Sequence, residues 1–290
     1  MTRDPVASFP DEPVMEPGAF QREQVGAGGD AQFRTLLAVL DLQEQYPSVR
    51  RLQQWVLDAV RAAAGEVAVD VGCGAGTQTR VLAGLVGPEG RAVGIDPNTL
   101  LLEVARERAV AAGDGGARAE FVEGDATALP FEDGSVDIIR CERVFQHLAD
   151  PAAAAREFAR VLAPGGRVAV TDSDWGTAIM GPVDPALARR YAESMWAASP
   201  NPFSGRHLRE HLRGAGLAVD PDIGSTGIVF PNAVLAEGGF LRMNAVRGVA
   251  EGFLTEAESD VLVEGLIAAA QRDEAFLSVT MFAVIGRKPA

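Results

Sequence analysis

The sequence predicts an α/β protein with a doubly wound, mostly parallel sheet. From Glu66 onward, short apolar runs alternate with amphipathic helical stretches. The apolar runs lie at 67–71, 92–95, 119–122, 136–141 and 167–172, and the helical patterns at 77–85, 100–112 and 151–162. Buried strands that alternate with helices at this spacing are typical of parallel strands joined by right-handed crossovers. The apolar content of 47% supplies a sizeable core.

The segments before and after this alternation lack the regular strand–helix pattern. Residues 1–30 mix Pro, Gly and acids without periodicity, which predicts a flexible N-terminal tail. Residues 31–64 hold two helical stripes separated by Tyr46-Pro47-Ser48, so N-terminal helices precede the core at 65–175. Residues 176–290 combine Pro-rich and helical stretches with strands near 217–219, 228–230 and 275–285. We expect this last part to form a helical cover and the final strands of the same sheet.

Composition and charge exclude several classes of function. There are 26 basic and 40 acidic residues, a net charge of −14, and no basic run, so nucleic acid and anionic membranes are poor partners. The chain has no apolar run long enough for membrane insertion, and prolines and acids interrupt its first residues, so a cytoplasmic location is expected. Cys73 and Cys141 are too few for a disulfide scaffold, and no Cys/His cluster predicts a metal site.

A glycine-rich turn follows the first predicted strand. Gly72, Gly74 and Gly76 occupy alternate positions between Asp70 and the helix that begins near Thr77. Glycines let a ligand approach the backbone closely, and a helix N-terminus offers free N–H groups, so a nucleotide-like ligand is indicated. A dinucleotide fingerprint that starts at Gly72 would need glycine at position 77. The threonine there argues against a nicotinamide-dependent oxidoreductase.

Acidic residues end the next two strands. Asp96 closes the second strand in Val93-Gly-Ile-Asp-Pro97, and Asp125 follows the third in Glu123-Gly-Asp-Ala-Thr127. The carboxyl ends of parallel strands share one edge of the sheet, where open α/β folds bind ligands. An acidic crevice there disfavours phosphate and favours a cation, and a carboxylate such as Asp96 can accept both hydroxyls of a ribose.

Four segments together resemble the class I, seven-strand S-adenosylmethionine-dependent methyltransferases, in particular the small-molecule subgroup of the ubiquinone and menaquinone methyltransferases. They are DVGCGAG at 70–76, GIDP at 94–97, GDATALPF at 124–131 and VLAPGGR at 161–167. The resemblance covers about residues 65–175. It implies a seven-strand sheet, S-adenosylmethionine as cofactor, and a helical lid over the acceptor site. A sulfonium ligand agrees with the cation that the acidic crevice favours.

The resemblance also implies roles for individual residues. Gly72, Gly74 and Gly76 would pack against the methionine part of the cofactor, Asp96 would bind the ribose, and Asp125 with Ala126 would hold the adenine edge. Asp70 either orders the loop or faces the cofactor's amino group. The expected cofactor-binding set is Asp70, Gly72, Cys73, Gly74, Gly76, Asp96, Pro97, Asp125, Ala126, Arg140 and Cys141.

The acceptor site is expected beyond the fourth and fifth strands. Gln146, His147, Trp175 and Trp196 are the predicted acceptor-binding residues. His147 could serve as the catalytic base, because imidazole titrates near neutrality, or could simply fill space at a helix start. The two tryptophans could instead belong to the core of the lid. A base is optional, because a sulfonium is already an activated electrophile.

These observations predict an enzyme that transfers a methyl group to O, N or C of a small, largely apolar molecule, in specialised metabolite biosynthesis. One alternative keeps the cofactor but catalyses cyclisation or rearrangement, with or without methylation. A quinone-biosynthesis methyltransferase and a non-catalytic binding protein are further alternatives. A homodimer also remains open.

Overall fold

The computed structural model describes the backbone of residues 22–113, 119–196 and 199–290, and the side chains in these ranges from Phe33 onward. Its helices are α1 (Arg22–Gln45), α2 (Pro47–Val60), α3 (Thr77–Val86), α4 (Thr99–Ala112), α5 (Pro151–Val161), α6 (Pro185–Trp196), α7 (Ser204–Gly214), α8 (Asn232–Glu237), α9 (Gly239–Ala250) and α10 (Glu256–Gln271), with a short 3₁₀ turn η1 (Phe145–His147). Its strands are β1 (Val67–Val71), β2 (Arg91–Asp96), β3 (Ala119–Glu123), β4 (Val136–Glu142), β5 (Leu162–Gly181), β6 (Ala218–Val219), β7 (Gly224–Val229) and β8 (Phe276–Arg287).

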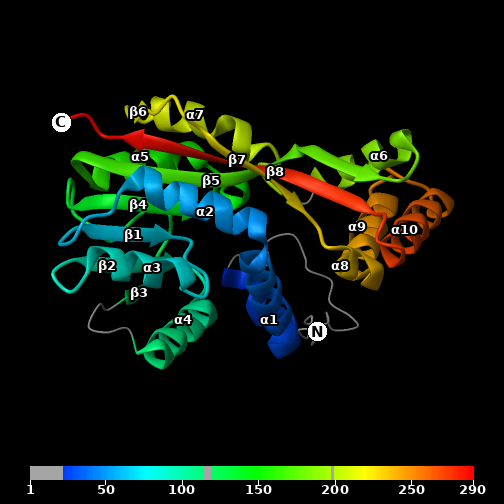
Figure 1. Cartoon of the computed structure of the whole chain (residues 1–290), viewed down its shortest axis with the longest axis horizontal. Coiled ribbons are helices and arrows are strands. Elements are labelled where there is room, and N and C mark those ends of the chain that lie inside the picture. The colour runs from blue at the N-terminus through cyan, green and yellow to red at the C-terminus, as the bar shows by residue number, and fades with distance from the viewer. Residues whose placement is uncertain (1–21, 114–118, 197–198) are drawn as a thin grey trace.

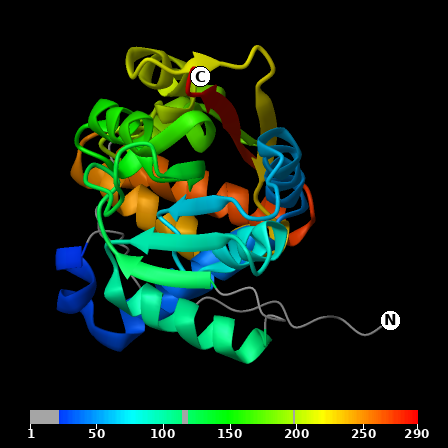
Figure 2. The same cartoon turned by 90° about the vertical axis from the view of Figure 1, so that its left-hand side faces the viewer.

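The strands form one mainly parallel sheet, which confirms the predicted fold class. Its order is β3-β2-β1-β4-β5-β8-β6, and β1 to β5 run parallel while β8 is antiparallel to β5. Figure 2 shows β1, β2 and β3 side by side and pointing the same way. The described residues form eight strands rather than the seven predicted. The additional strand arises because β8 is long enough for its free edge to pair with β7 at Ser278–Ala283 and with β6 at Gly286–Arg287.

Helices cover both faces of the sheet. On one face, Phe158 of α5 and Leu208 of α7 pack against Val69, Ile139 and other strand residues. On the other face, Val56 of α2 and Leu82 of α3 pack against a second set of strand side chains. Because each face is apolar and covered, the strands read as nearly continuous hydrophobic runs, which is why the sequence pattern located them.

Strands β5 and β8 extend beyond the rest of the sheet as a two-stranded ribbon, and the ribbon carries α6, α8, α9 and α10 at one end of the molecule (Figure 1). These helices have a core of their own, which includes Tyr191, Leu241 and Leu266. We call this part, the ribbon end with α6 and α8 to α10, the lid. It stands at the carboxyl ends of the parallel strands, in the part of the chain where the sequence predicted a cover.

Several boundaries differ from the sequence prediction, including the start of α1 and the end of β5. Helix α1 begins at Arg22, within the segment predicted as a flexible tail, while residues 1–21 of that segment lie outside the described residues. Gly26, Gly28 and Gly29 have low helix propensity, so nothing in the sequence signalled this first part of the helix. Strand β5 runs to Gly181 rather than ending near 172, because β8 pairs with its extension.

Candidate cofactor and acceptor site

A cavity of about 1890 Å³ opens at the carboxyl ends of the parallel strands. Its walls come from the glycine turn after β1, the ends of β2 and β4, helix α1 and the lid. One continuous space therefore joins the region where the sequence predicted the cofactor to the region where it predicted the acceptor.

The glycine turn forms one end of this cavity. The backbone N–H groups of Gly72 and Cys73 donate to the carbonyl of Ile95, which ties the turn to β2. Gly72, Gly74 and Gly76 have φ angles of 71°, 53° and 78°, a region that side chains rarely adopt. Gly72, Cys73 and Gly74, which the sequence predicted as cofactor contacts, line the cavity; their contact with the cofactor stays a prediction.

Gly76 differs from Gly72 and Gly74, because the direction in which a side chain would project at Gly76 is toward the protein interior. A Cβ atom at this position would lie 2.6 Å from Phe121 and 2.8 Å from Ala105. The residue is absent from the cavity wall among the described residues. This third glycine therefore allows helix α3 to pack closely on the sheet, a requirement that spacing alone does not distinguish from ligand contact.

The Asp96 carboxylate lies on the cavity wall at the end of β2. Its two oxygens accept the backbone N–H groups of Gly74, at 2.9 Å, and of Asn98, at 2.8 Å. The side chain is buried, and burial raises the pKa of Asp96 to about 6 despite these two hydrogen bonds. A carboxylate has about four lone-pair positions, so Asp96 can still accept hydroxyl groups from a ligand. Pro97, the next residue, also lines the cavity.

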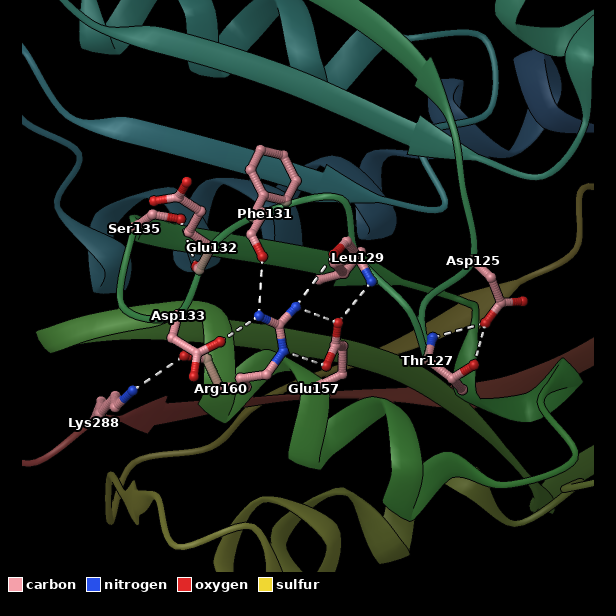
Figure 3. Close-up of polar contacts among 10 residues, drawn as sticks. All are labelled: Asp125, Thr127, Leu129, Phe131, Glu132, Asp133, Ser135, Glu157, Arg160 and Lys288. Carbon is pink, nitrogen blue, oxygen red and sulfur yellow. Dashed lines mark hydrogen bonds and ion pairs between the residues drawn. The ribbon is translucent and has the colours of Figure 1, made fainter.

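The loop that carries Asp125 is anchored to helix α5 by Arg160 (Figure 3). The Arg160 guanidinium donates to the carbonyls of Leu129, at 3.2 Å, and Phe131, at 3.0 Å, and pairs with Glu157 and Asp133. Asp125 itself is exposed, lines the cavity, and accepts the backbone N–H of Thr127 at 2.7 Å. Arg160 thus fixes the shape of a loop whose cavity-facing carboxylate has little packing of its own.

A buried charge network lies behind the glycine turn. Arg140 pairs with Asp70 at 3.0 Å and with Glu142, and Glu142 also pairs with Arg143 at 3.1 Å. Asp70 accepts the hydroxyl of Thr79 at 2.8 Å, which links β1 to α3. Burial raises the pKa of Asp70, while Arg140 and Thr79 oppose that rise. Of the two roles left open for Asp70, these contacts support the ordering of the loop.

Two predicted cofactor neighbours present no side chain to the cavity. Cys141 is fully buried in the core on the α5 face, and Ala126 packs into the same core. Neither contributes to the cavity wall among the described residues. Successive side chains on a strand point to opposite faces of the sheet, which explains why Arg140 reaches the network while Cys141 does not.

The lid end of the cavity is apolar. Phe230 and Phe240 stack with ring centroids 5.2 Å apart. The apolar residues that line this end are Trp175, Met195, Ile228, Phe230, Val234, Phe240, Met243, Val246 and Val279. A planar or long apolar molecule would match this surface.

Gln146 connects η1 to this apolar end. Its backbone N–H donates to buried Asp172 at 2.8 Å, and its side-chain oxygen accepts the indole N–H of Trp175 at 3.0 Å. An indole N–H is a donor only, so the Gln146 amide must present its oxygen to Trp175 and keep its NH₂ group for other partners. Gln146 and Trp175, predicted as acceptor-binding residues, both line the cavity.

Trp196 lies behind Trp175 rather than on the cavity wall. Its indole N–H donates to the Trp175 carbonyl at 2.9 Å, and its ring packs against Phe203. Among the described residues, those on the cavity wall do not include Trp196. The structure therefore gives no support to the prediction that Trp196 binds the acceptor. Helical spacing placed it near the lid but did not fix the direction of the ring.

His147 also lines the cavity. Burial and the nearby Arg143 guanidinium lower the pKa of His147 to about 4. The imidazole is therefore neutral near pH 7 and able to accept a proton, although its low pKa makes it a weak base.

Several cavity residues escaped the sequence prediction. Ile228 lies on β7 and Val279 on β8, and Phe230 directly follows β7. Strand alternation could have assigned Ile228 and Val279 to one face of the sheet but not to this cavity. The side-chain NH₂ group of Gln53 on α2 donates to the Glu142 carboxylate at 3.3 Å, although the two residues lie far apart in the chain. No local signal in the sequence could have revealed that pair.

Comparison with known proteins identifies the family. Residues 69–170 match a family model described as "Methyltransferase domain". The chain is 32% identical to the ubiquinone/menaquinone biosynthesis C-methyltransferase of Hahella chejuensis over 62% of this chain and 74% of that protein. It is 36% identical to an uncharacterised 37.1 kDa protein of transposon TN4556 from Streptomyces fradiae over 87% of this chain and 69% of that one. Among solved structures, the [4+2]-cyclase SpnF is similar in fold, with a TM-score of 0.52 and 22% identity over 83% of this chain and 81% of that one.

The fold, the glycine turn and the two strand-end acids define a nucleotide-type site in a Rossmann-like sheet. The chain belongs to the class I S-adenosylmethionine-dependent methyltransferases. Among the residues described, no helix has both the length and the hydrophobicity that crossing a membrane requires.

Proposed function

We propose that this enzyme binds S-adenosylmethionine at the glycine-turn end of the cavity and methylates O, N or C of a largely apolar molecule held at the lid end. The observation that carries the proposal is the continuity of the cavity from Gly72 and Asp96 to Trp175 and Phe240. In this scheme the core at 65–175 holds the cofactor, the helices of 31–64 cover it, and 176–290 supply the acceptor wall.

The residues present fit the cofactor. A Cβ atom at Gly72 would clash with the Val144 side chain, and the positive φ also favours glycine, so the backbone of the turn carries no side chain at this point of the cavity wall. Asp96 keeps lone pairs for the ribose hydroxyls, and Asp125 is exposed where the adenine edge would lie. The adenine contact assigned to Ala126 would have to come from its backbone, since its side chain is buried in the core.

The size of the cavity supports an acceptor of considerable bulk. Typical small-molecule sites measure about 300–1,000 Å³, whereas this cavity measures about 1890 Å³. This volume is larger than the cofactor alone would fill, which favours a specialised metabolite with an extended apolar skeleton as the acceptor. Quinone methylation, the activity in the name of the Hahella relative, is the main competing assignment.

Bound S-adenosylmethionine supplies a methyl group already activated on a sulfonium. The task of the protein is then to align the acceptor atom with that methyl, a contribution of about 7 to 11 kcal/mol where orientation is good. The Gln146 NH₂ group, fixed by Trp175, is placed to donate to an acceptor oxygen. His147, neutral at pH 7, can take a proton from an acceptor that must lose one.

Thermal unfolding with S-adenosylmethionine, S-adenosylhomocysteine or NAD tests the cofactor assignment. A ligand at a hundredfold its Kd should add about 2.7 kcal/mol to the free energy of unfolding. Stabilisation by NAD alone would contradict the proposal.

Incorporation of labelled methyl into a metabolite extract tests the reaction. Product that forms without label would indicate cyclisation or rearrangement. With a labelled acceptor in hand, His147→Ala should lower kcat if the imidazole acts as base, and unchanged turnover would dismiss that role.

A further inference from the structure

The cationic side chains on the cavity wall differ in their partners. Arg140 and Arg143 pair with carboxylates of the buried network, and Arg242 pairs with Glu264 at 2.7 Å. Arg247 lines the same cavity and is half-buried. Within the described part of the chain its guanidinium makes no hydrogen bond or ion pair, although its backbone carbonyl accepts the N–H of Glu251. Arg247 therefore keeps a free guanidinium on the cavity wall.

The position of Arg247 is set by helix α9. Phe240, Met243, Asn244 and Arg247 recur at helical spacing, and all four line the cavity. The opposite side of α9 is fixed in the lid core, where the carbonyl of Leu241 accepts the Tyr191 hydroxyl at 3.0 Å. Arg247 thus belongs to the helical face that closes the acceptor end.

The two ends of the cavity also differ in charge. Asp70, Asp96, Glu123, Asp125 and Glu142 line the sheet end, where the cationic cofactor would bind. From Ser173 to Val279, the described residues on the wall include two arginines and no carboxylate. Because Arg242 is neutralised by Glu264, the net positive charge of the lid end falls on Arg247.

We propose that Arg247 recognises an anionic oxygen group, such as a carboxylate, sulfate or phosphate, on an otherwise apolar acceptor. This inference rests on the proposed function and adds the chemical class of its substrate. A guanidinium presents a planar pair of N–H donors that matches two anionic oxygens. The resulting ion pair is strongest where apolar walls exclude water. The acceptor is thus an amphiphile whose apolar body lies against Trp175, Phe230 and Phe240 and whose anionic group lies at α9.

Arg247 also stands in the last turn of α9, where a cation is favourable to the helix dipole. A purely structural role of this kind would alter stability but not the choice between charged and neutral ligands. The test therefore compares two probes that share one apolar body.

The probes are 8-anilinonaphthalene-1-sulfonate and the uncharged N-phenyl-1-naphthylamine, both of which fluoresce in apolar sites. They are titrated into the full chain with saturating S-adenosylhomocysteine. We expect the sulfonate to bind about tenfold more tightly than the neutral probe. Arg247→Met should remove this preference by weakening the sulfonate alone, and Arg247→Lys should restore part of it.

Arg242→Met is the matched control, because it removes a second cavity arginine that already has a carboxylate partner. We expect it to leave the ratio of the two affinities unchanged. An equal loss in both variants, or no change in Arg247→Met, would overturn the proposal. The Kd for S-adenosylhomocysteine should be the same in all variants, so a failure of cofactor binding would instead count against the proposed function.

Discussion

The two ends of the cavity are built by different means. The glycine-turn end relies on backbone geometry and on residues that lie within a short stretch of chain, such as Gly72, Gly74 and Asp96. The lid end relies on side chains from β5, β7, α6 and α9 that meet only in the folded protein. The first end is therefore intolerant of small changes and suits one fixed ligand, whereas the second can vary its side chains without disturbing the sheet.

The largest effect should come from the close packing beneath the glycine turn. Gly76→Ala adds a Cβ that meets Phe121 and Ala105 and also forces a positive φ, so we expect the free energy of unfolding to fall by about 3 kcal/mol. Gly113→Ala is the control, since Gly113 has a similar left-handed conformation, with a φ of 60°, but no atom of the described residues within 4 Å of an added Cβ. It should cost about 1 kcal/mol, from backbone strain alone. Equal losses in denaturant titrations would show that packing at Gly76 is unimportant.

The second effect concerns Asp96 and pH. Ribose hydroxyls would donate to the ionised carboxylate, so binding favours the charged form of a group whose pKa is about 6. The affinity for S-adenosylhomocysteine should be full above about pH 7 and fall by up to about tenfold per pH unit below 6. Asp96→Asn should weaken binding about tenfold to a hundredfold at pH 7.5 and flatten this profile, as measured by calorimetry. A variant that keeps the slope would assign the titration to another group.

The third effect concerns the binding of apolar ligands at the lid end, which we expect to be independent of cofactor binding. Phe240→Ala removes the stack on Phe230 and should weaken N-phenyl-1-naphthylamine binding about threefold to tenfold, without changing the Kd for S-adenosylhomocysteine. Phe203→Ala removes a comparable ring contact, with Trp196, away from the cavity wall. It should leave both affinities unchanged. Loss of cofactor affinity in Phe240→Ala would mean that the two ends are not independent.

The smallest effect is expected at the loop of Asp125. Arg160→Met removes the hydrogen bonds to the carbonyls of Leu129 and Phe131 and should raise the Kd for S-adenosylhomocysteine about threefold, because the loop is no longer fixed. Arg156→Met on the same helix removes an exposed pair with Asp150 and should have no measurable effect. Similar Kd values for the two variants would show that the anchor is dispensable.

The same contrast explains what the sequence could predict. The strands, the crossover helices, Gly72, Gly74, Asp96 and Asp125 follow from local patterns, and the structure places these four residues on the cavity wall. Cys141 and Trp196 have side chains directed away from the cavity, and an added Cβ at Gly76 would meet Phe121 and Ala105, because spacing along the chain does not fix which way a residue faces. Phe230 and Arg247 could not be placed, since their position depends on how β7 and α9 pack against distant segments.

A crystal structure with S-adenosylhomocysteine tests the central claim most directly. We predict the ribose hydroxyls within hydrogen-bond distance of Asp96, the amino-acid part against Gly72 and Gly74, and the sulfur facing Gln146 and the lid end. A nucleoside bound among Trp175, Phe230 and Phe240, or a ribose that makes no contact with Asp96, would contradict the division of the cavity into these two ends.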